Sequence, residues 1–222
     1  MAHTTLPENI QRNLQNWRWV DAVLCLRARH VLRKSQIHRY LPKAGLMLDL
    51  GAGAGHITEA IVNDAPARSC VMIDPVSSIS PHVARRMAPF SSLPMKGDGT
   101  HLPFLDSTFD AAWSSFMLHH VPFDGQQKIL GEIARVLRTD ATFVLLEDTP
   151  SNAQEAKNTL RADRRLNFEP EEAPHHYRSP VEWRNDLPQH GLLIDREIAF
   201  KRVFPPATLR AVQHRAFVCH RR

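Results

Sequence analysis

The 222-residue sequence lacks the features of a membrane-spanning or disulfide-rich protein. No apolar run approaches the ~20 residues that a membrane-spanning helix needs. The polar stretch from Met1 to Asn9 also lacks the apolar core of a secretory signal. Cysteine occurs only at Cys25, Cys70 and Cys219, far apart and without the paired spacing of a zinc site or a disulfide framework. We therefore expect a cytoplasmic protein with reduced thiols.

What the sequence does contain is typical of one packed α/β domain. Hydrophobic residues make up 43% and charged residues 23%, which excludes a disordered or fibrous chain. Positive charge gathers at the two ends, because residues 1–43 carry eight Lys or Arg against two Asp or Glu, and residues 196–222 carry seven against one. Basic ends suit an anionic partner such as RNA, a phosphorylated metabolite or a membrane surface, or are simply solvated helix faces.

Residues 1–43 are predicted to form a helical cover. Apolar residues recur at mostly three-, four- and seven-residue steps from Pro7 to Leu41, with a break expected near Ser35. Trp17 lies on this pattern. Its side chain either packs on the protein's own core or helps to close a substrate pocket.

After Gly45, predicted strands and helices alternate in the order of a doubly wound, mostly parallel sheet. The predicted strands are Leu46–Leu50, Cys70–Asp74, Phe109–Trp113, Thr142–Glu147, Leu193–Phe200 and Arg215–His220, and the predicted helices are His56–Asn63 and Gln126–Leu137. Residues 151–178 are polar and interrupt this rhythm, and Ser179 and Pro180 are typical of a helix start. We expect residues 44–222 to form the main domain, with a substrate-cover insertion at about 151–190.

The strongest functional pattern is a strand that runs directly into a glycine loop, Gly51-Ala52-Gly53-Ala54-Gly55. Small residues let a ligand approach the backbone at the carboxyl end of a strand, where open α/β sheets bind ligands. His56 stands where a dinucleotide fingerprint would have its third glycine, which disfavours an NAD-dependent oxidoreductase. Asp74 ends the next strand and is placed to accept hydrogen bonds from ribose hydroxyls.

Three blocks, in this order and spacing, resemble the class I methyltransferases, in particular the methyltransferase type 11 group. They are the glycine loop with Asp49, the run Val71-Met72-Ile73-Asp74, and the stretch from Gly97-Asp98-Gly99-Thr100 to Ser115. The resemblance covers Leu46 to Asp148, nearly half the chain. It implies a Rossmann-like fold with a seven-stranded sheet and S-adenosylmethionine as cofactor.

The resemblance also implies roles for individual residues. Asp49 and the backbone of Gly51, Ala52, Gly53 and Gly55 would hold the methionine part of the cofactor, Asp74 the ribose, Asp98 with Gly99 the adenine amino group, Pro75 the flank of the adenine, and Ser114 or Ser115 the methionine ammonium through a carbonyl. Without the other two blocks, Asp98 would be interpreted as an ordinary turn residue.

Two histidine pairs are candidates for the acceptor side. His119 or His120 could act as general base, or the pair could instead orient the cofactor, as its occurrence in many type 11 relatives with different acceptors suggests. His175, His176 and Tyr177 lie in the predicted cover, either in the acceptor pocket or as exposed loop residues. We predict no metal site, because a His-His pair alone lacks a third ligand at a recognisable spacing.

The sequence thus predicts S-adenosylmethionine-dependent methyl transfer to a small-molecule acceptor by in-line displacement. One alternative is an RNA methyltransferase that uses the basic ends. The other is a cofactor-binding protein without catalysis. Salt-sensitive binding would favour the first, and cofactor binding without turnover the second.

Overall fold

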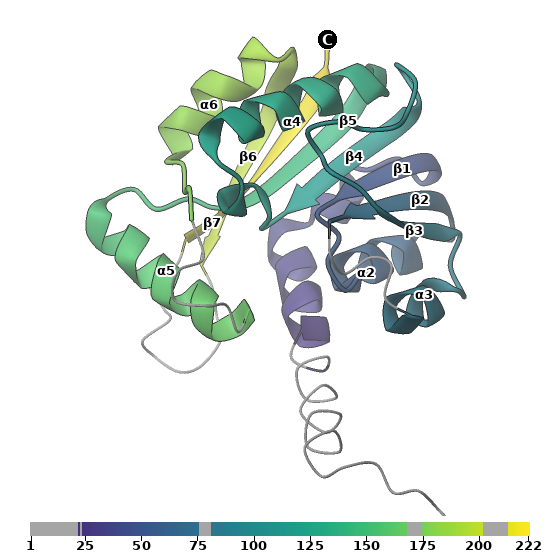
Figure 1. Cartoon of the computed structure of the whole chain (residues 1–222), viewed down its shortest axis with the longest axis horizontal. Helices are drawn as coiled ribbons and strands as arrows, with labels where there is room; N and C mark the ends of the chain where they lie inside the picture. Colours follow the sequence, from purple (N-terminus) through teal and green to yellow (C-terminus); the bar gives the residue numbers. More distant parts are fainter. Residues whose placement is uncertain (1–21, 23, 76–80, 168–174, 202–212) are drawn as a thin grey trace, which may run out of the picture.

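The computed structural model describes residues 22, 24–75, 81–167, 175–201 and 213–222, and these contain one mixed sheet (Figure 1). Its strands, in the spatial order β3-β2-β1-β4-β5-β7-β6, number seven within the described ranges. Their bounds are β1 Ala44–Leu50, β2 Ala67–Asp74, β3 Ser92–Lys96, β4 Phe109–Ser115, β5 Leu137–Asp148, β6 Leu192–Lys201 and β7 Gln213–Arg221. Strands β1 to β5 are parallel, and β7 runs antiparallel to both β5 and β6. The predicted doubly wound sheet is confirmed.

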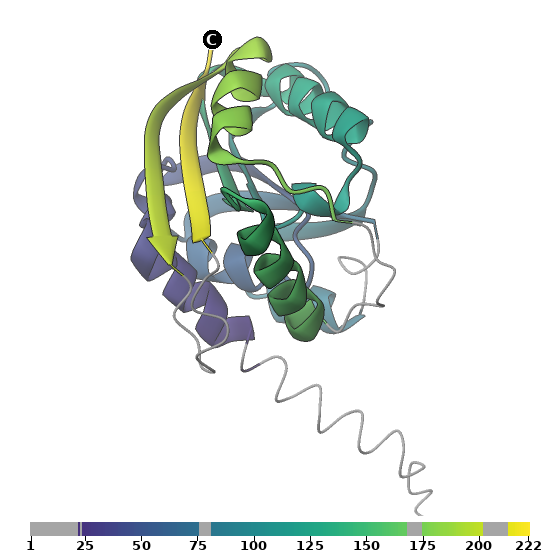
Figure 2. The same ribbon diagram turned by 90° about the vertical axis from the view of Figure 1, so that its left-hand side faces the viewer.

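Helices cover both faces of the sheet (Figures 1 and 2). The helical elements are residues 24–35, η1 Ile37–Arg39, α2 His56–Asp64, α3 Pro81–Met87, η2 Leu118–His120, α4 Phe123–Val136, α5 Ala153–Asn167 and α6 Pro180–Gln189. Helices α4 and α6 pack on one face, and residues 24–35, α2 and α3 pack on the other. The helix over residues 24–35 ends where the break near Ser35 was predicted, whereas Trp17 lies outside the described residues.

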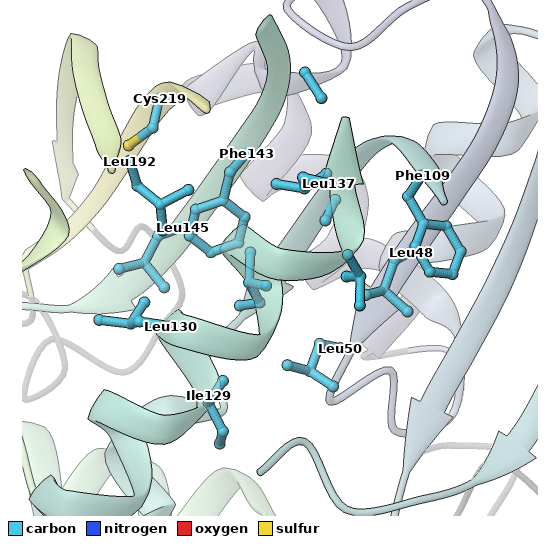
Figure 3. Close-up of a cluster of buried hydrophobic side chains, with 14 of the residues drawn as sticks. Leu48, Leu50, Phe109, Ile129, Leu130, Leu137, Phe143, Leu145, Leu192 and Cys219 are labelled. Atoms are coloured by element: carbon cyan, nitrogen blue, oxygen red, sulfur yellow. The ribbon is translucent and has the colours of Figure 1, made fainter. Parts of the chain in front are cut away.

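The two faces follow from the alternation of side chains along each strand. In β1, Leu48 and Leu50 point toward α4, where they join Ile129 and Leu130 in the core shown in Figure 3. Met47 points to the opposite face and packs in the second core. Because both faces are covered, β1 is apolar almost throughout. Burying each large apolar side chain contributes about 1.5–3 kcal/mol.

Helix α6 begins where the sequence predicted. The Ser179 hydroxyl accepts a hydrogen bond from the Glu182 amide, and the Glu182 carboxylate accepts one from the Ser179 amide, which is a capping box. Trp183 and Leu187 are buried on its inner face. This anchors the chain on the α4 side directly after the segment that carries His175.

Helix α3, strand β3 and helix α5 were not among the predicted elements. Strand β3 is short, carries Pro94 and has no fully buried residue, as suits an edge strand. Helix α5 lies in the polar segment that was predicted to be a cover, and it buries only a narrow face that includes Thr159, Ala162 and Asp163. None of the helices in the described ranges combines the length and apolarity needed to span a bilayer.

Candidate functional site

The glycine loop after β1 lies at the carboxyl edge of the sheet and is tied to β2. The amides of Gly51 and Ala52 donate to the carbonyl of Ile73, at 2.8 and 3.2 Å. Gly51 has φ +77°, and an added Cβ would lie 2.2 Å from Cγ of Met117. Gly53 has φ +53°, but an added Cβ would meet nothing within 4 Å. Gly51 is therefore required by packing, while Gly53 faces open space.

Asp74 extends from the end of β2 to this loop. Its Oδ2 accepts a hydrogen bond of 3.0 Å from the Gly53 amide. The predicted pairing of a glycine loop with a carboxylate on the neighbouring strand is thus present, because parallel strands end at the same edge of the sheet. Pro75 follows and is exposed at the same edge.

Asp49 is buried beneath the loop, on the face that α2 covers. The Thr58 hydroxyl of α2 donates a hydrogen bond to Oδ2 of Asp49. Burial raises the pKa of the Asp49 carboxyl to about 7, although the bond from Thr58 favours the charged form. A buried carboxyl group whose pKa lies near neutrality is typical of a functional site.

The remaining candidate cofactor residues lie along the same edge. Asp98 accepts hydrogen bonds from the amide and hydroxyl of Thr100, and these lower the pKa of its carboxyl. Gly99 packs against Leu50. Among the described residues, the buried hydroxyls of Ser114 and Ser115 at the end of β4 find no hydrogen-bond partner. Unpaired buried hydroxyls are costly, so a ligand at this edge would have donors and acceptors to satisfy.

His119 lies between two buried carboxylates. Its Nδ1 is 2.7 Å from Oε2 of Glu147, at the end of β5, and its Nε2 is 2.8 Å from Oδ2 of Asp163 in α5. The other Glu147 oxygen accepts the amides of Met117 and Leu118, which holds η2 in place. Burial alone would lower the pKa of His119, but the two carboxylates raise it well above its ordinary value.

His175 and Tyr177 approach the same carboxylate from the segment before α6. The Tyr177 hydroxyl donates to Oδ2 of Asp163 at 3.1 Å, and Nε2 of His175 lies 3.5 Å from that oxygen. Burial alone would raise the pKa of Asp163, but hydrogen bonds from His119 and His175 hold it below its usual range. The ring of His176 instead contacts Phe123.

The second histidine of η2 completes this arrangement. The His120 ring centroid lies 4.1 Å from that of His119 and 5.0 Å from that of His175. We call His119, His120, Glu147, Asp163 and His175 the histidine–carboxylate cluster. Four of them, all except Glu147, each offer a potential metal-ligand atom, and these atoms lie within 4.8 Å of one another.

The cluster changes two sequence-based interpretations. Sequence spacing showed no third potential ligand near His175, whereas the fold places potential ligand atoms from η2 and α5 beside it. His119, predicted as a possible base, has both ring nitrogens directed at carboxylates, so that neither nitrogen is open to a proton from the acceptor. Its surroundings therefore argue against that role.

Comparisons with known proteins agree with this geometry. A family model described as a methyltransferase domain matches residues 48–145. The uncharacterised methyltransferase YcgJ of Bacillus subtilis is 31% identical over 105 residues, which cover 46% of this chain and 40% of that protein. A demethylmenaquinone methyltransferase of Mycolicibacterium paratuberculosis is 38% identical over 109 residues, covering 48% of this chain and 44% of that protein.

Solved structures share the fold of this chain. A SAM-dependent methyltransferase structure from Methanosarcina mazei superposes with a TM-score of 0.65 at 21% identity, covering 83% of this chain and 96% of that chain. Residues 48–145 of the chain thus match a methyltransferase domain of the type 11 group, within a fold shared with solved methyltransferases. The chain spans less than half the length of the curated relatives it matches.

The matched part of the methyltransferase domain includes the glycine loop and the residues at the ends of β2 and β4, but it stops before the end of β5. Glu147, Asp163 and His175 therefore lie outside it. Sequence reasoning assigned no role to Thr58, Glu147 or Asp163. Glu147 carried a usable signal, a carboxylate at the carboxyl end of a parallel strand, whereas Asp163 in a polar helix carried none.

Proposed function

We propose that this chain transfers a methyl group from S-adenosylmethionine to a small-molecule acceptor. The observation that carries the proposal is the glycine loop, where open space in front of Gly53 stands beside Asp74 and the unpartnered hydroxyls of Ser114 and Ser115. A nucleoside joined to an amino acid fits this edge, because it brings ribose hydroxyls to one end and an ammonium group to the other.

The residues at the edge would divide the cofactor between them. Asp74 would accept the ribose hydroxyls, Asp98 the adenine amino group, and the Gly51–Gly55 backbone and Asp49 would hold the methionine part. When bound, the cofactor supplies an electrophilic methyl group on a sulfonium sulfur. Burial raises the pKa of Asp49. A bound ammonium group would act in the opposite direction, because a nearby positive charge favours the ionised form of a carboxyl.

The protein's own contribution is then alignment and exclusion of water. An in-line displacement needs acceptor, methyl and sulfur in one line, and holding two reactants in that geometry lowers the barrier by several kcal/mol. Since His119 is held between Glu147 and Asp163, we assign it no proton transfer from the acceptor. His120, which is only partly buried and lies against the rings of His119 and His175, is not assigned that role either. An amine or thiol acceptor would need no such base.

The small-molecule class rests on the relatives, of which the mycobacterial protein is named for demethylmenaquinone. We propose that residues 1–43 and about 151–190 form the cover over the acceptor. A cytoplasmic location stays a prediction, as does the role of Trp17.

Calorimetry with S-adenosylmethionine, its demethylated product and NAD tests the donor. We expect both adenosyl ligands to bind and NAD not to bind. Asp74→Ala should weaken the adenosyl ligands by about 1.5–3 kcal/mol for each charge-assisted hydrogen bond lost. Binding of NAD alone would refute the proposal.

Labelled S-adenosylmethionine with pooled metabolites or with RNA tests the acceptor. Label in a small molecule supports the proposal. Label in RNA, with binding that weakens steeply with salt, would support the RNA alternative instead. Cofactor binding without label in any product would identify a binding protein.

A further inference from the structure

The histidine–carboxylate cluster has a composition that simple packing does not require. It gathers three imidazoles and two carboxylates from η2, the end of β5, α5 and the segment before α6. The side chains of His119, Asp163 and His175 are at most 3% exposed. Burying so many polar groups at one point is costly unless each is paired or bound to an ion.

We propose that His119, His120, Asp163 and His175 bind one divalent transition-metal ion, with zinc as the best match. Their potential ligand atoms already lie within 4.8 Å of one another. Zinc sites use imidazole nitrogen and carboxylate oxygen at about 2.0–2.2 Å, and structural sites close with four protein ligands in a tetrahedron. A small inward shift of the four side chains would complete such a shell.

The surroundings of the four side chains match the outer shell of a metal site. Nδ1 of His119 is 2.7 Å from Glu147, so that Nε2 is the nitrogen directed at the centre of the cluster. Ligand histidines usually donate their other nitrogen to a carboxylate in this way, which sets the tautomer and the ring orientation. Tyr177 donates to Asp163 and orients that carboxylate.

The chemistry of the cluster favours a divalent transition-metal ion. The buried carboxyl groups of Glu147 and Asp163 lie on either side of the His119 ring. A divalent cation bound to Nε2 of His119 would replace any proton on that nitrogen, and the proton would pass to solvent. Imidazole-rich ligand sets favour zinc and related ions over magnesium or calcium.

The ion would act as a clamp. Besides the cluster, the segment before α6 is held to η2 by the His176 amide, which donates to the His119 carbonyl at 2.6 Å. Four protein ligands from three segments would fasten α5 and this segment to the end of β4. This inference does not rest on methyl transfer, since metal binding can be measured without cofactor or acceptor.

The test is zinc titration of chelator-treated protein by calorimetry, with cobalt as an optical probe of four-coordinate binding. We expect one zinc ion per chain, and a shift of the unfolding equilibrium toward the folded state by about 100-fold when free zinc is 100 times the dissociation constant. His120→Ala and His175→Ala should each weaken zinc binding by more than about 100-fold, since loss of an outer hydrogen bond alone costs 10- to 100-fold.

His176→Ala is the matched control, because its ring contacts Phe123 outside the cluster. It should bind zinc as the unchanged protein does. Circular dichroism establishes that each variant is folded. Glu147→Gln should weaken zinc by about 10- to 100-fold as a positioning residue. No zinc binding by the folded protein, or equal binding by both ligand variants and the control, would overturn the proposal, and neither result would bear on cofactor binding.

Discussion

Replacing Asp49 by Asn should stabilise the ligand-free protein, and more so at high pH. Burial raises the pKa of the folded-state carboxyl from its ordinary 3.8 to about 7. Between these two values the unfolded chain has lost its proton while the folded protein keeps it, so the free energy of unfolding falls as pH rises. Asn has nearly the same shape and does not titrate, so the variant should escape this loss.

The magnitude follows from the two pKa values. Each pKa unit corresponds to about 1.4 kcal/mol, so the loss reaches about 4 kcal/mol above pH 7 and is about 1.6 kcal/mol at pH 5. The stability gained by Asp49→Asn should therefore be larger at pH 8 than at pH 5 by about 3 kcal/mol. Urea unfolding followed by circular dichroism at the two pH values measures this difference, provided that the dependence on urea is unchanged.

Thr58→Val is the matched variant, because it removes the hydroxyl that donates to Asp49 and keeps the shape of the side chain. It should destabilise the protein, and more at pH 8, where the lost hydrogen bond is to a charged group and is stronger. An Asp49→Asn variant that is no more stable at pH 8, or whose effect is the same at both pH values, would refute the reasoning.

Two further pairs of substitutions compare the two loop glycines and test the start of helix α6. Gly51→Ala should cost about 2–5 kcal/mol in urea unfolding, from its left-handed backbone and its clash with Met117, whereas Gly53→Ala should cost only the backbone part, about 1–2 kcal/mol. Equal costs would contradict this assignment. Ser179→Ala should lower stability by about 1 kcal/mol through loss of the capping box, and exposed Val181→Ala should change it by less than about 0.5 kcal/mol.

The parts of the fold that could be predicted are those whose burial is visible in the sequence. Strands β1 and β2 are nearly continuous apolar runs buried on both faces, and the predicted ranges differ from the observed ones by at most three residues at either end. The amino-terminal part of β5 was missed because Arg138 to Asp140 are exposed there. Strand β3 was missed for the same reason, because it lies at the edge of the sheet and none of its residues is fully buried.

The candidate site also has a part that could be predicted from the sequence and a part that could not. The donor edge was predictable because its residues follow directly after strands, and parallel strands bring such positions together. The histidine–carboxylate cluster was not, because Asp163 and His175 meet His119 only through the packing of α5 and the segment before α6. No local spacing encodes that meeting. A polar helix such as α5 looks like a solvated cover until its single buried carboxylate is located.

The position of β7 determines when the sheet can be completed during synthesis. Strand β7 leaves the ribosome after β6, yet it lies between β5 and β6. A nascent chain can pair β1 to β5 as they emerge, but β6 has to wait for its strand partner, because β6 pairs with β7. During that interval the outer edge of β5 offers unpaired amides and carbonyls to any extended segment nearby. Chaperone binding should therefore concentrate in the interval before residues 213–221 become available.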